Sequence, residues 1–403
     1  ASQMPVEFAL PSLFRGRSFV VSGDEKQMPP TSFFSSRIEN DEADVLDDEI
    51  DEGGSQEMLD ERKDTWNRRE IKDCPDLLQL AKSNVPTEIL QVHYRSRFRE
   101  LIAFSNAAFY DGRLHVPCRH PDNEIQRAKP LELVRVDGIY ADQTNLREAE
   151  EVVEQLSRLW AGPASTRKTV GVVTFNRKQA DLIESTLEER AELDSFFREA
   201  YSQERERSED GEDVGFFVKN VENVQGDERD IIIFSSTFGR NAQGTFRRSF
   251  GVLGQVGGER RLNVAISRAK EKVILVTSMP IAEISDLLST RRVADSPRDF
   301  LQAYFEYARS MTAGEFENAR ALLGRLSVQQ RTSGPKRRTG DDGVKAAVRK
   351  FLVEELQLLV EQFSEADAFA IDFAVTDQRT GTFGFGIEID APRDPLLERA
   401  RAR

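Results

Sequence analysis

The 403-residue sequence contains only two cysteines and three histidines, which limits the disulfide and metal chemistry open to it. Cys74 and Cys118 give no disulfide framework, and such sparse cysteine usage is typical of a reducing cytoplasm. His115, Cys118 and His120 lie close together in the sequence, but their spacing is not that of a zinc site and no second cluster completes it. We therefore expect neither a disulfide scaffold nor a structural zinc ion.

Long apolar runs are lacking as well. No run approaches the roughly 20 residues that a membrane-spanning helix needs. The first residues also lack the basic-then-apolar pattern of a secretory signal. With 39% hydrophobic and 31% charged residues, the composition is typical of a soluble globular protein, and the length suffices for two or three domains. We expect a cytoplasmic protein.

Positive charge is in short supply overall, since the formal net charge is −14. The deficit is local, because residues 39–61 hold twelve Asp and Glu and no Lys or Arg. Without those twelve, 58 acidic residues stand against 56 Lys and Arg, so a groove for nucleic acid is not excluded. The acidic run itself is typical of a solvated, disordered insertion. The alternative is a segment that mimics nucleic acid and blocks such a groove.

Between residues 88 and 280, apolar patterns predict strands that alternate with helices, which indicates a doubly wound α/β domain. The continuous apolar run at 230–235 fits a parallel strand buried on both faces. The predicted strands are 18–22, 131–136, 169–174, 216–218, 230–235 and 272–277, and the predicted helices are 75–83, 96–109, 146–160, 176–190 and 260–269. Residues 193–213 are expected to form a loop or an exposed helix, 239–258 a long loop, and 281–325 helices. Residues 334–343 predict a linker, followed by helix 344–361 and strands 369–376 and 383–390.

Two segments in the first quarter of the chain carry polar groups suited to phosphate chemistry. Residues 23–30 (Gly-Asp-Glu-Lys-Gln-Met-Pro-Pro) follow a predicted strand, at the end of a sheet where α/β folds bind ligands. Asp24 and Gln27 there could contact a phosphate or its attacking water, although Gly-Asp is also a common turn. Residues 93–96 (His-Tyr-Arg-Ser) place Arg95 just before a helix. Its planar cation suits a transferring phosphoryl group. The alternative is a surface salt bridge, which would be the favoured interpretation if Arg95 stood alone.

Two further segments flank the strand predicted at 230–235. Residues 223–230 (Asn-Val-Gln-Gly-Asp-Glu-Arg-Asp) precede it, and Gly226 there permits close approach of a ligand to the backbone. Gln225 and Glu228 offer polar groups at the same turn. Residues 260–270 (Arg-Arg-Leu-Asn-Val-Ala-Ile-Ser-Arg-Ala-Lys) read as a helix with one apolar face and with Arg261 and Arg268 near one side. The alternative is a basic helix exposed to solvent.

In order and in sequence, these four segments resemble motifs III, IV, V and VI of superfamily 1 helicases. The most similar branch contains the RNA-surveillance and Dna2-like helicases. The resemblance covers residues 1–280 and is carried above all by residues 261–270 and 224–230. It implies a RecA-like doubly wound parallel sheet, with a complete second RecA-like domain and part of a first. It also implies ATP and Mg²⁺ as cofactors and a bacterial cytoplasmic location.

The resemblance implies a role for each motif residue. Gln27 would sense the γ-phosphate of ATP, with Asp24 beside it. Arg95 and Arg268 would be the arginine fingers that stabilise charge on the transferring phosphoryl group. The other implied nucleotide contacts are Tyr94, stacked on the adenine, and Gln225, Gly226, Glu228 and Arg261, near the ribose and phosphates.

Residues 172–176 (Val-Val-Thr-Phe-Asn) resemble the strand and turn with which the second domain of this family touches nucleic acid. Thr174 and Asn176 would contact the backbone, so they would read phosphate and sugar but no base sequence. The implied partner is single-stranded or duplex nucleic acid, with DNA expected.

ATP hydrolysis in this class needs a Gly-x-x-x-x-Gly-Lys-Ser/Thr loop and an Asp-Glu pair that holds Mg²⁺ and water. The sequence contains no such loop. Residues 1–3 (Ala-Ser-Gln) resemble the end of the family's Asp-Glu-Ala-Ser-Gln motif II. We therefore expect the chain to be the C-terminal part of a longer motor, with the upstream half in the same parent chain, and to be inactive alone.

The last sixty residues carry acidic side chains on two predicted strands. Asp372 lies on the first, and Glu388 and Asp390 lie on the second, so they could hold a divalent metal for phosphodiester cleavage. This part resembles a restriction-endonuclease-like domain of the very-short-patch-repair type, with Glu354 or Glu355 as a further acid. Asp390 stands where that family places a Lys, and Arg403 falls inside the expected domain, which would be truncated.

The predicted organisation has four parts. Residues 1–87 would end the first RecA-like domain and carry the acidic insertion 39–61. Residues 88–290 would form the second RecA-like domain, 291–343 a helical segment and linker, and 344–403 the restriction-endonuclease-like domain. The expected function is that of an ATP-dependent helicase motor. The alternatives are a nucleic-acid-binding module without turnover and a metal-dependent nuclease.

Overall fold

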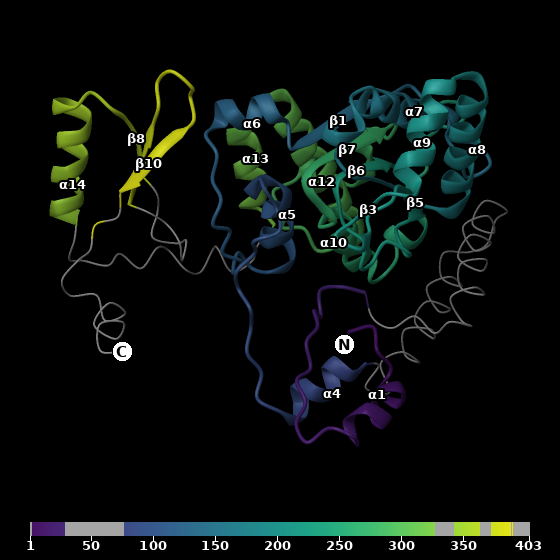
Figure 1. The fold of residues 1–403 in the computed structure, drawn as a ribbon, viewed down its shortest axis with the longest axis horizontal. Coiled ribbons are helices and arrows are strands. Elements are labelled where there is room, and N and C mark those ends of the chain that lie inside the picture. Colours follow the sequence, from purple (N-terminus) through teal and green to yellow (C-terminus); the bar gives the residue numbers. More distant parts are fainter. Residues whose placement is uncertain (1, 29–75, 327–341, 363–371, 388, 390–403) are drawn as a thin grey trace.

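In a computed structural model, which describes residues 2–28, 76–326, 342–362, 372–387 and 389, a five-stranded parallel sheet forms the centre of the chain (Figure 1). Its order is β1-β7-β6-β2-β5, and every neighbouring pair is parallel. The strands are β1 (Leu131–Arg135), β2 (Val170–Thr174), β5 (Phe217–Asn220), β6 (Arg229–Ser235) and β7 (Ala269–Thr277). The predicted α/β class and its RecA-like parallel sheet are confirmed.

The apolar run of β6 explains why this strand lies inside the sheet. Side chains alternate between the two faces of a strand. Ile232 and Phe234 therefore join the apolar cluster on one face, while Ile231 and Ile233 join the cluster on the other. Helices cover both faces, as a strand that is apolar on both sides requires.

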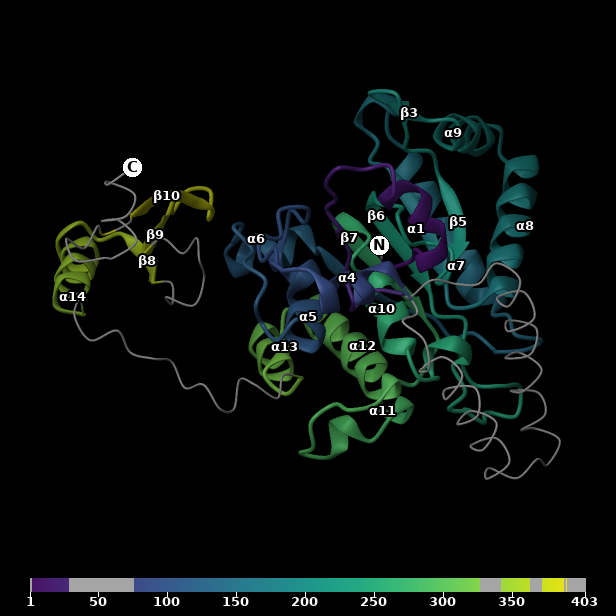
Figure 2. The ribbon, with the colours of Figure 1, turned by 90° about the horizontal axis from the view of Figure 1, so that it is seen from below.

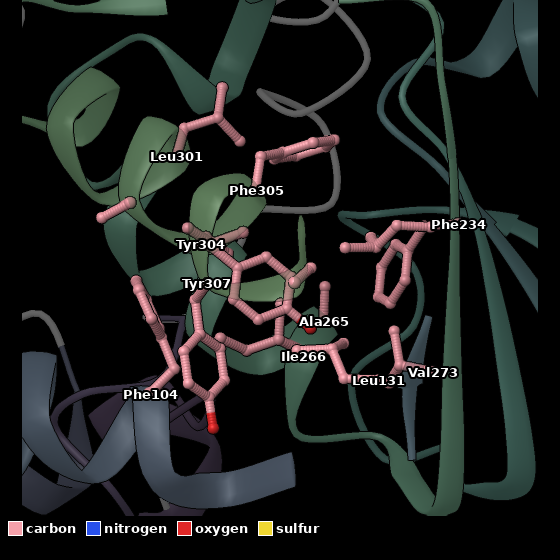
Figure 3. Packing of buried hydrophobic residues seen from close by; sticks show 14 of the residues in the cluster. Phe104, Leu131, Phe234, Ala265, Ile266, Val273, Leu301, Tyr304, Phe305 and Tyr307 are labelled. Atoms are coloured by element: carbon pink, nitrogen blue, oxygen red, sulfur yellow. The ribbon is translucent and has the colours of Figure 1, made fainter. Parts of the chain in front are cut away.

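One face is covered by α5 (Arg99–Phe109), α10 (Gly258–Ile266) and α12 (Pro297–Ala313). Figure 3 shows the rings of Phe104, Tyr304 and Tyr307 gathered between these helices and the sheet. The other face is covered by α7 (Leu146–Trp160), α8 (Arg177–Leu193) and α9 (Ser195–Arg205). Besides the helices of these two layers, five further α-helices lie in the described chain before residue 326. They are α1 (Val6–Leu13), α4 (Leu77–Asn84), α13 (Phe316–Leu323), the shorter α6 (Asp122–Ala128) and the four-residue α11 (Ile281–Ile284).

The strand predicted at 18–22 is wrong. These residues form no strand, and the side chains of Phe19 and Val20 are 53% and 96% exposed. A strand needs a neighbour that accepts its backbone hydrogen bonds. No strand within the described part of the chain pairs with 18–22. Residues 18–22 therefore do not join a sheet of the described structure.

The last described part is a separate antiparallel sheet of order β10-β9-β8, joined to α14 (Asp342–Lys350) and a π-helical turn, η5 (Phe351–Glu355). The predicted helix 344–361 is wrong at its end, because β8 (Leu359–Gln362) pairs with β9 (Phe373–Thr376). The two predicted strands are confirmed over β9 and β10 (Phe383–Ile387). Figure 2 shows this sheet beside α6, where Gly381 closely approaches Asn123.

Several predictions fall outside the described residues, namely the acidic insertion 39–61, most of the linker 334–343, Cys74, Glu388 and Asp390. Residues 193–213, expected to be a loop or an exposed helix, form α9 and a short hairpin of β3 (Ser208–Glu209) and β4 (Glu212–Asp213). None of the described helices is long and apolar enough to cross a membrane.

Candidate functional site

Charged side chains gather at the amino-terminal ends of β6 and β7. These strands are parallel neighbours, with Arg229 opposite Ala269, so Glu228 just before β6 lies near Lys270 at the start of β7. Glu228 Oε1 accepts from Lys270 Nζ at 3.0 Å, and Glu228 Oε2 lies 2.8 Å from Arg95 Nε. Arg95 is brought there because Arg97, two residues on, donates its backbone N–H to the Lys270 carbonyl at 2.8 Å.

These two cations control the protonation of Glu228. Burial alone would raise the pKa of the Glu228 carboxyl, but the hydrogen bond from Lys270 and the charges of Arg95 and Lys270 outweigh it. The pKa therefore lies below its ordinary value, and Glu228 is a carboxylate at neutral pH. The structure brings together Arg95 and Glu228, both predicted to act on the nucleotide, and adds Lys270, for which the sequence predicted no role.

Arg268 is buried at the junction between α10 and β7, with 5% of its surface exposed. Its Nε donates to the Val264 carbonyl at 2.7 Å, and one terminal nitrogen donates to Ser267 Oγ at 3.2 Å. Burial and the positive charge of Arg95 lower the pKa of Arg268. A guanidinium has five N–H groups. Among the described residues these two acceptors are the hydrogen-bond partners of Arg268, so further N–H groups remain for an anionic ligand.

The turn that contains Asp24 and Gln27 is attached to α10. Asp24 Oδ2 accepts from Gln27 Nε2 at 3.0 Å and from the Tyr110 hydroxyl at 2.6 Å. Asn263 Nδ2 donates to the Lys26 carbonyl at 2.9 Å. The sequence assigned no role to either Tyr110, which caps the end of α5, or Asn263. Asn263 lies within the motif segment 260–270, and an amide side chain there was a usable signal.

Two other predicted nucleotide contacts, Gln225 and Gly226, lie on the same side of the sheet, in the loop between β5 and β6. Gln225 Oε1 accepts from Gln3 Nε2 at 2.7 Å, which joins the first described residues to this loop. Gly226 has φ +97°, a conformation that favours glycine, and a Cβ there would meet open space. Tyr94 is 86% exposed, and Arg261 Nε lies 3.3 Å from Glu222 Oε1.

Gly258→Ala is expected to lower the free energy of unfolding by about 1 to 2 kcal/mol. Gly258 begins α10, and a Cβ there would lie only 2.3 Å from the Leu253 carbonyl oxygen, so the helix would have to shift. The matched control is Gly254→Ala, where the nearest atom to the new Cβ is 3.5 Å away. Urea unfolding of both variants checks this. Equal midpoints would contradict it.

The residues predicted to contact nucleic acid lie at the opposite, carboxyl-terminal edge of the sheet. Thr174 is fully buried, and its Oγ1 donates to the Asn176 carbonyl at 2.6 Å. Asn176 caps α8 by accepting from the Gln179 N–H at 2.8 Å, and its Nδ2 donates to the Gln143 carbonyl. Both side chains therefore have structural partners, and contact with nucleic acid stays a prediction.

The predicted metal site in the last domain is described only in part. Asp372 Oδ1 lies 2.7 Å from Lys345 Nζ, while Glu388 and Asp390 fall outside the described residues. Glu354 and Glu355 are exposed. Within the described residues no three His, Cys, Asp or Glu side chains gather closely enough to hold a metal ion. The nuclease site stays a prediction.

Comparisons with known proteins agree with the motifs. A family model described as an AAA domain matches residues 75–280. The ATP-dependent helicase MG140 of Mycoplasma genitalium is 39% identical over 278 residues, which are 68% of this chain and 22% of that protein. The DNA replication ATP-dependent helicase/nuclease DNA2 of Gallus gallus is 26% identical over 285 residues, 70% of this chain and 22% of that one.

The chain thus spans about a fifth of the length of these curated relatives. A solved structure, the C-terminal domain of a possible DNA helicase from Lactobacillus plantarum WCFS1, is 18% identical and covers 46% of this chain and 90% of its own. Its TM-score of 0.25 is too low for a comparison of folds. Its motifs and its relatives among ATP-dependent helicases, DNA2 included, are consistent with the Dna2-like branch of superfamily 1 helicases. From its family match, the chain belongs to the AAA domain family.

Proposed function

We propose that this chain is the part of an ATP-driven helicase that completes the nucleotide site and couples it to nucleic acid, with DNA as the substrate. One observation carries the proposal. Arg95 pairs with Glu228 at one edge of the parallel sheet, and the neighbouring Arg229 donates its backbone N–H to the Arg268 carbonyl at 3.3 Å. The helix α10, which leads to Arg268, also holds the turn of Gln27.

The chemistry of the two arginines supports this. Phosphoryl transfer spreads negative charge over oxygens, and planar guanidinium groups stabilise that charge. Arg268 is held rigid by Val264 and Ser267, so its orientation is set before a ligand binds. Arg95 is paired with Glu228, and we propose that ATP phosphates take over from that carboxylate when the cleft closes. Mg²⁺ bound with ATP would neutralise part of the phosphate charge.

Nucleic acid would be held at the far edge of the same sheet, around Thr174 and Asn176. Nucleotide-driven closure at one edge and strand contacts at the other would then move the protein along a single strand. Contacts to the backbone would make that movement independent of base sequence.

The 403-residue chain alone is expected to show no ATP turnover above background, with or without single-stranded DNA, since its sequence has no phosphate-binding loop. A coupled assay of released phosphate checks this. Binding of fluorescent ATP and of a labelled oligonucleotide is measured in parallel. Binding of both ligands is expected of a part that couples ATP to nucleic acid, whereas a simple nucleic-acid-binding module would bind the oligonucleotide alone. Turnover by the chain alone would show that its nucleotide site is built differently.

A further inference from the structure

A directed chain of hydrogen bonds runs from α10 to the turn of Gln27. Asn263 Nδ2 donates to the Lys26 carbonyl at 2.9 Å and to the Tyr110 hydroxyl oxygen at 3.0 Å. Tyr110 in turn donates its proton to Asp24 Oδ2 at 2.6 Å, and Gln27 Nε2 donates to the same oxygen. The Lys26 carbonyl can only accept, so the amide orientation of Asn263 is fixed by its partners.

Burial makes this chain sensitive to the loss of any member. Asn263 is 1% exposed, and its Oδ1 has no hydrogen-bond partner among the residues that the structure describes. Burial and the neighbouring charge of Asp24 raise the pKa of Tyr110, so the phenol keeps its proton and remains a donor.

Apolar contact alone would not orient the turn. Met28, at the end of the described turn, is 4% exposed and belongs to the cluster that also contains α10. Such contact is non-directional. The direction of the Gln27 amide is set by Asp24, and Asp24 is held by Tyr110, so the polar chain determines where Gln27 points.

We infer that Tyr110 and Asn263 are positioning residues that fasten the Asp24–Gln27 turn to α10. Gln27 and the helix leading to Arg268 then move as one unit. The inference rests on the proposed function, in which Gln27 senses phosphate and Arg268 stabilises the reaction. The inference adds a physical link through which a change in the position of Gln27 would move α10 and Arg268.

The contact itself is testable in the chain alone by hydrogen exchange of the backbone amides in residues 23–28. Tyr110→Phe removes the hydroxyl and keeps the ring, and we expect these amides to exchange about tenfold faster. Tyr307→Phe is the matched control, because its hydroxyl donates to the Glu100 carbonyl at 3.1 Å elsewhere in the same cluster. It should leave residues 23–28 unchanged. Asp24→Asn, outside the core, should reproduce the acceleration without disturbing α5, and unchanged exchange in both test variants would overturn the inference.

The coupling is testable in a complete motor that contains the phosphate-binding loop. With a single-stranded DNA oligonucleotide, Tyr110→Phe should lower kcat for ATP about tenfold while leaving KM for ATP and oligonucleotide affinity unchanged. A loosened fold would change KM and affinity as well. If Tyr110→Phe left kcat unchanged in a motor that hydrolyses ATP, only this inference would be overturned. If the motor without any substitution showed no ATP turnover, the proposed function would be overturned.

Discussion

Arg268→Ala in a complete motor is expected to lower kcat for ATP about a thousandfold, while binding of single-stranded DNA is retained. The buried guanidinium has N–H groups available beside Arg95, and alanine supplies neither charge nor donors. Arg268→Lys should recover little of the loss. A lysine ammonium lacks the planar fork, and it could not keep the bond from Nε to the Val264 carbonyl.

Phosphate release and oligonucleotide binding, measured on the same preparations, check this expectation. Arg320→Ala is the matched control, because Arg320 is exposed on α13, outside all the motif segments, and pairs with Asp122 and Glu317. It should leave both measurements unchanged. Turnover by Arg268→Ala within tenfold of the unaltered motor would remove Arg268 from the proposed catalytic machinery.

Much of the central fold follows from local sequence. The bounds of α7, 146–160, were predicted as observed from the helical spacing of its apolar residues, namely Val152, Val153, Leu156 and Leu159. In the structure Asn145 caps the helix. The continuous apolar run of β6 identified a strand buried on both faces. In both cases the buried residues that stabilise the element are close together in the sequence. A short stretch of sequence is therefore enough to predict the element.

The failures have a common physical cause, which is dependence on a distant partner. Residues 18–22 have strand composition, but no strand of the described chain pairs with them. Leu359 and Val360 continue a helical pattern, yet their backbone pairs with Thr376 and Val375 of β9. Local propensity cannot decide either case, because the deciding hydrogen bonds come from elsewhere.

The candidate site was likewise predictable from the sequence only in part. The motifs identified Arg95, Glu228 and Arg268 individually. The sharing of Glu228 between Arg95 and Lys270 depends on β6 and β7 being neighbours, which the sequence order does not state. Glu148 received no role at all from the sequence, although it connects α7 to the ends of both strands.

Glu148→Gln is expected to lower the free energy of unfolding by about 3 kcal/mol at neutral pH. Glu148 is fully buried, and each of its oxygens accepts from a backbone N–H: Oε1 from Ser278 and Oε2 from Thr237, both at 2.7 Å. The hydroxyls of Ser235 and Ser236 donate to it as well. In glutamine one oxygen becomes an NH₂ group. In either orientation of the amide, its NH₂ group faces the buried backbone N–H of Ser278 or of Thr237, and neither group can accept.

The pH dependence of stability offers a second, independent measurement. Burial raises the pKa of Glu148 from an ordinary 4.5 to about 7, and hydrogen bonds from Ser235 and Thr237 offset only part of that effect. Between these two values the folded protein holds a proton that the unfolded chain has released. The contribution of Glu148 is therefore largest below pH 4.5, declines as pH rises, and levels off above about 7.

The decline should reach about 3 kcal/mol, at about 1.4 kcal/mol for each pKa unit. Urea unfolding at several pH values should show it in the unaltered chain and not in Glu148→Gln, which cannot titrate. Glu150→Gln, on the exposed surface of the same helix, is the matched control and should keep the slope. Parallel pH profiles for the unaltered chain and Glu148→Gln would mean that Glu148 is ionised throughout. The hydrogen bonds donated to its carboxylate would then compensate the burial of the charge completely.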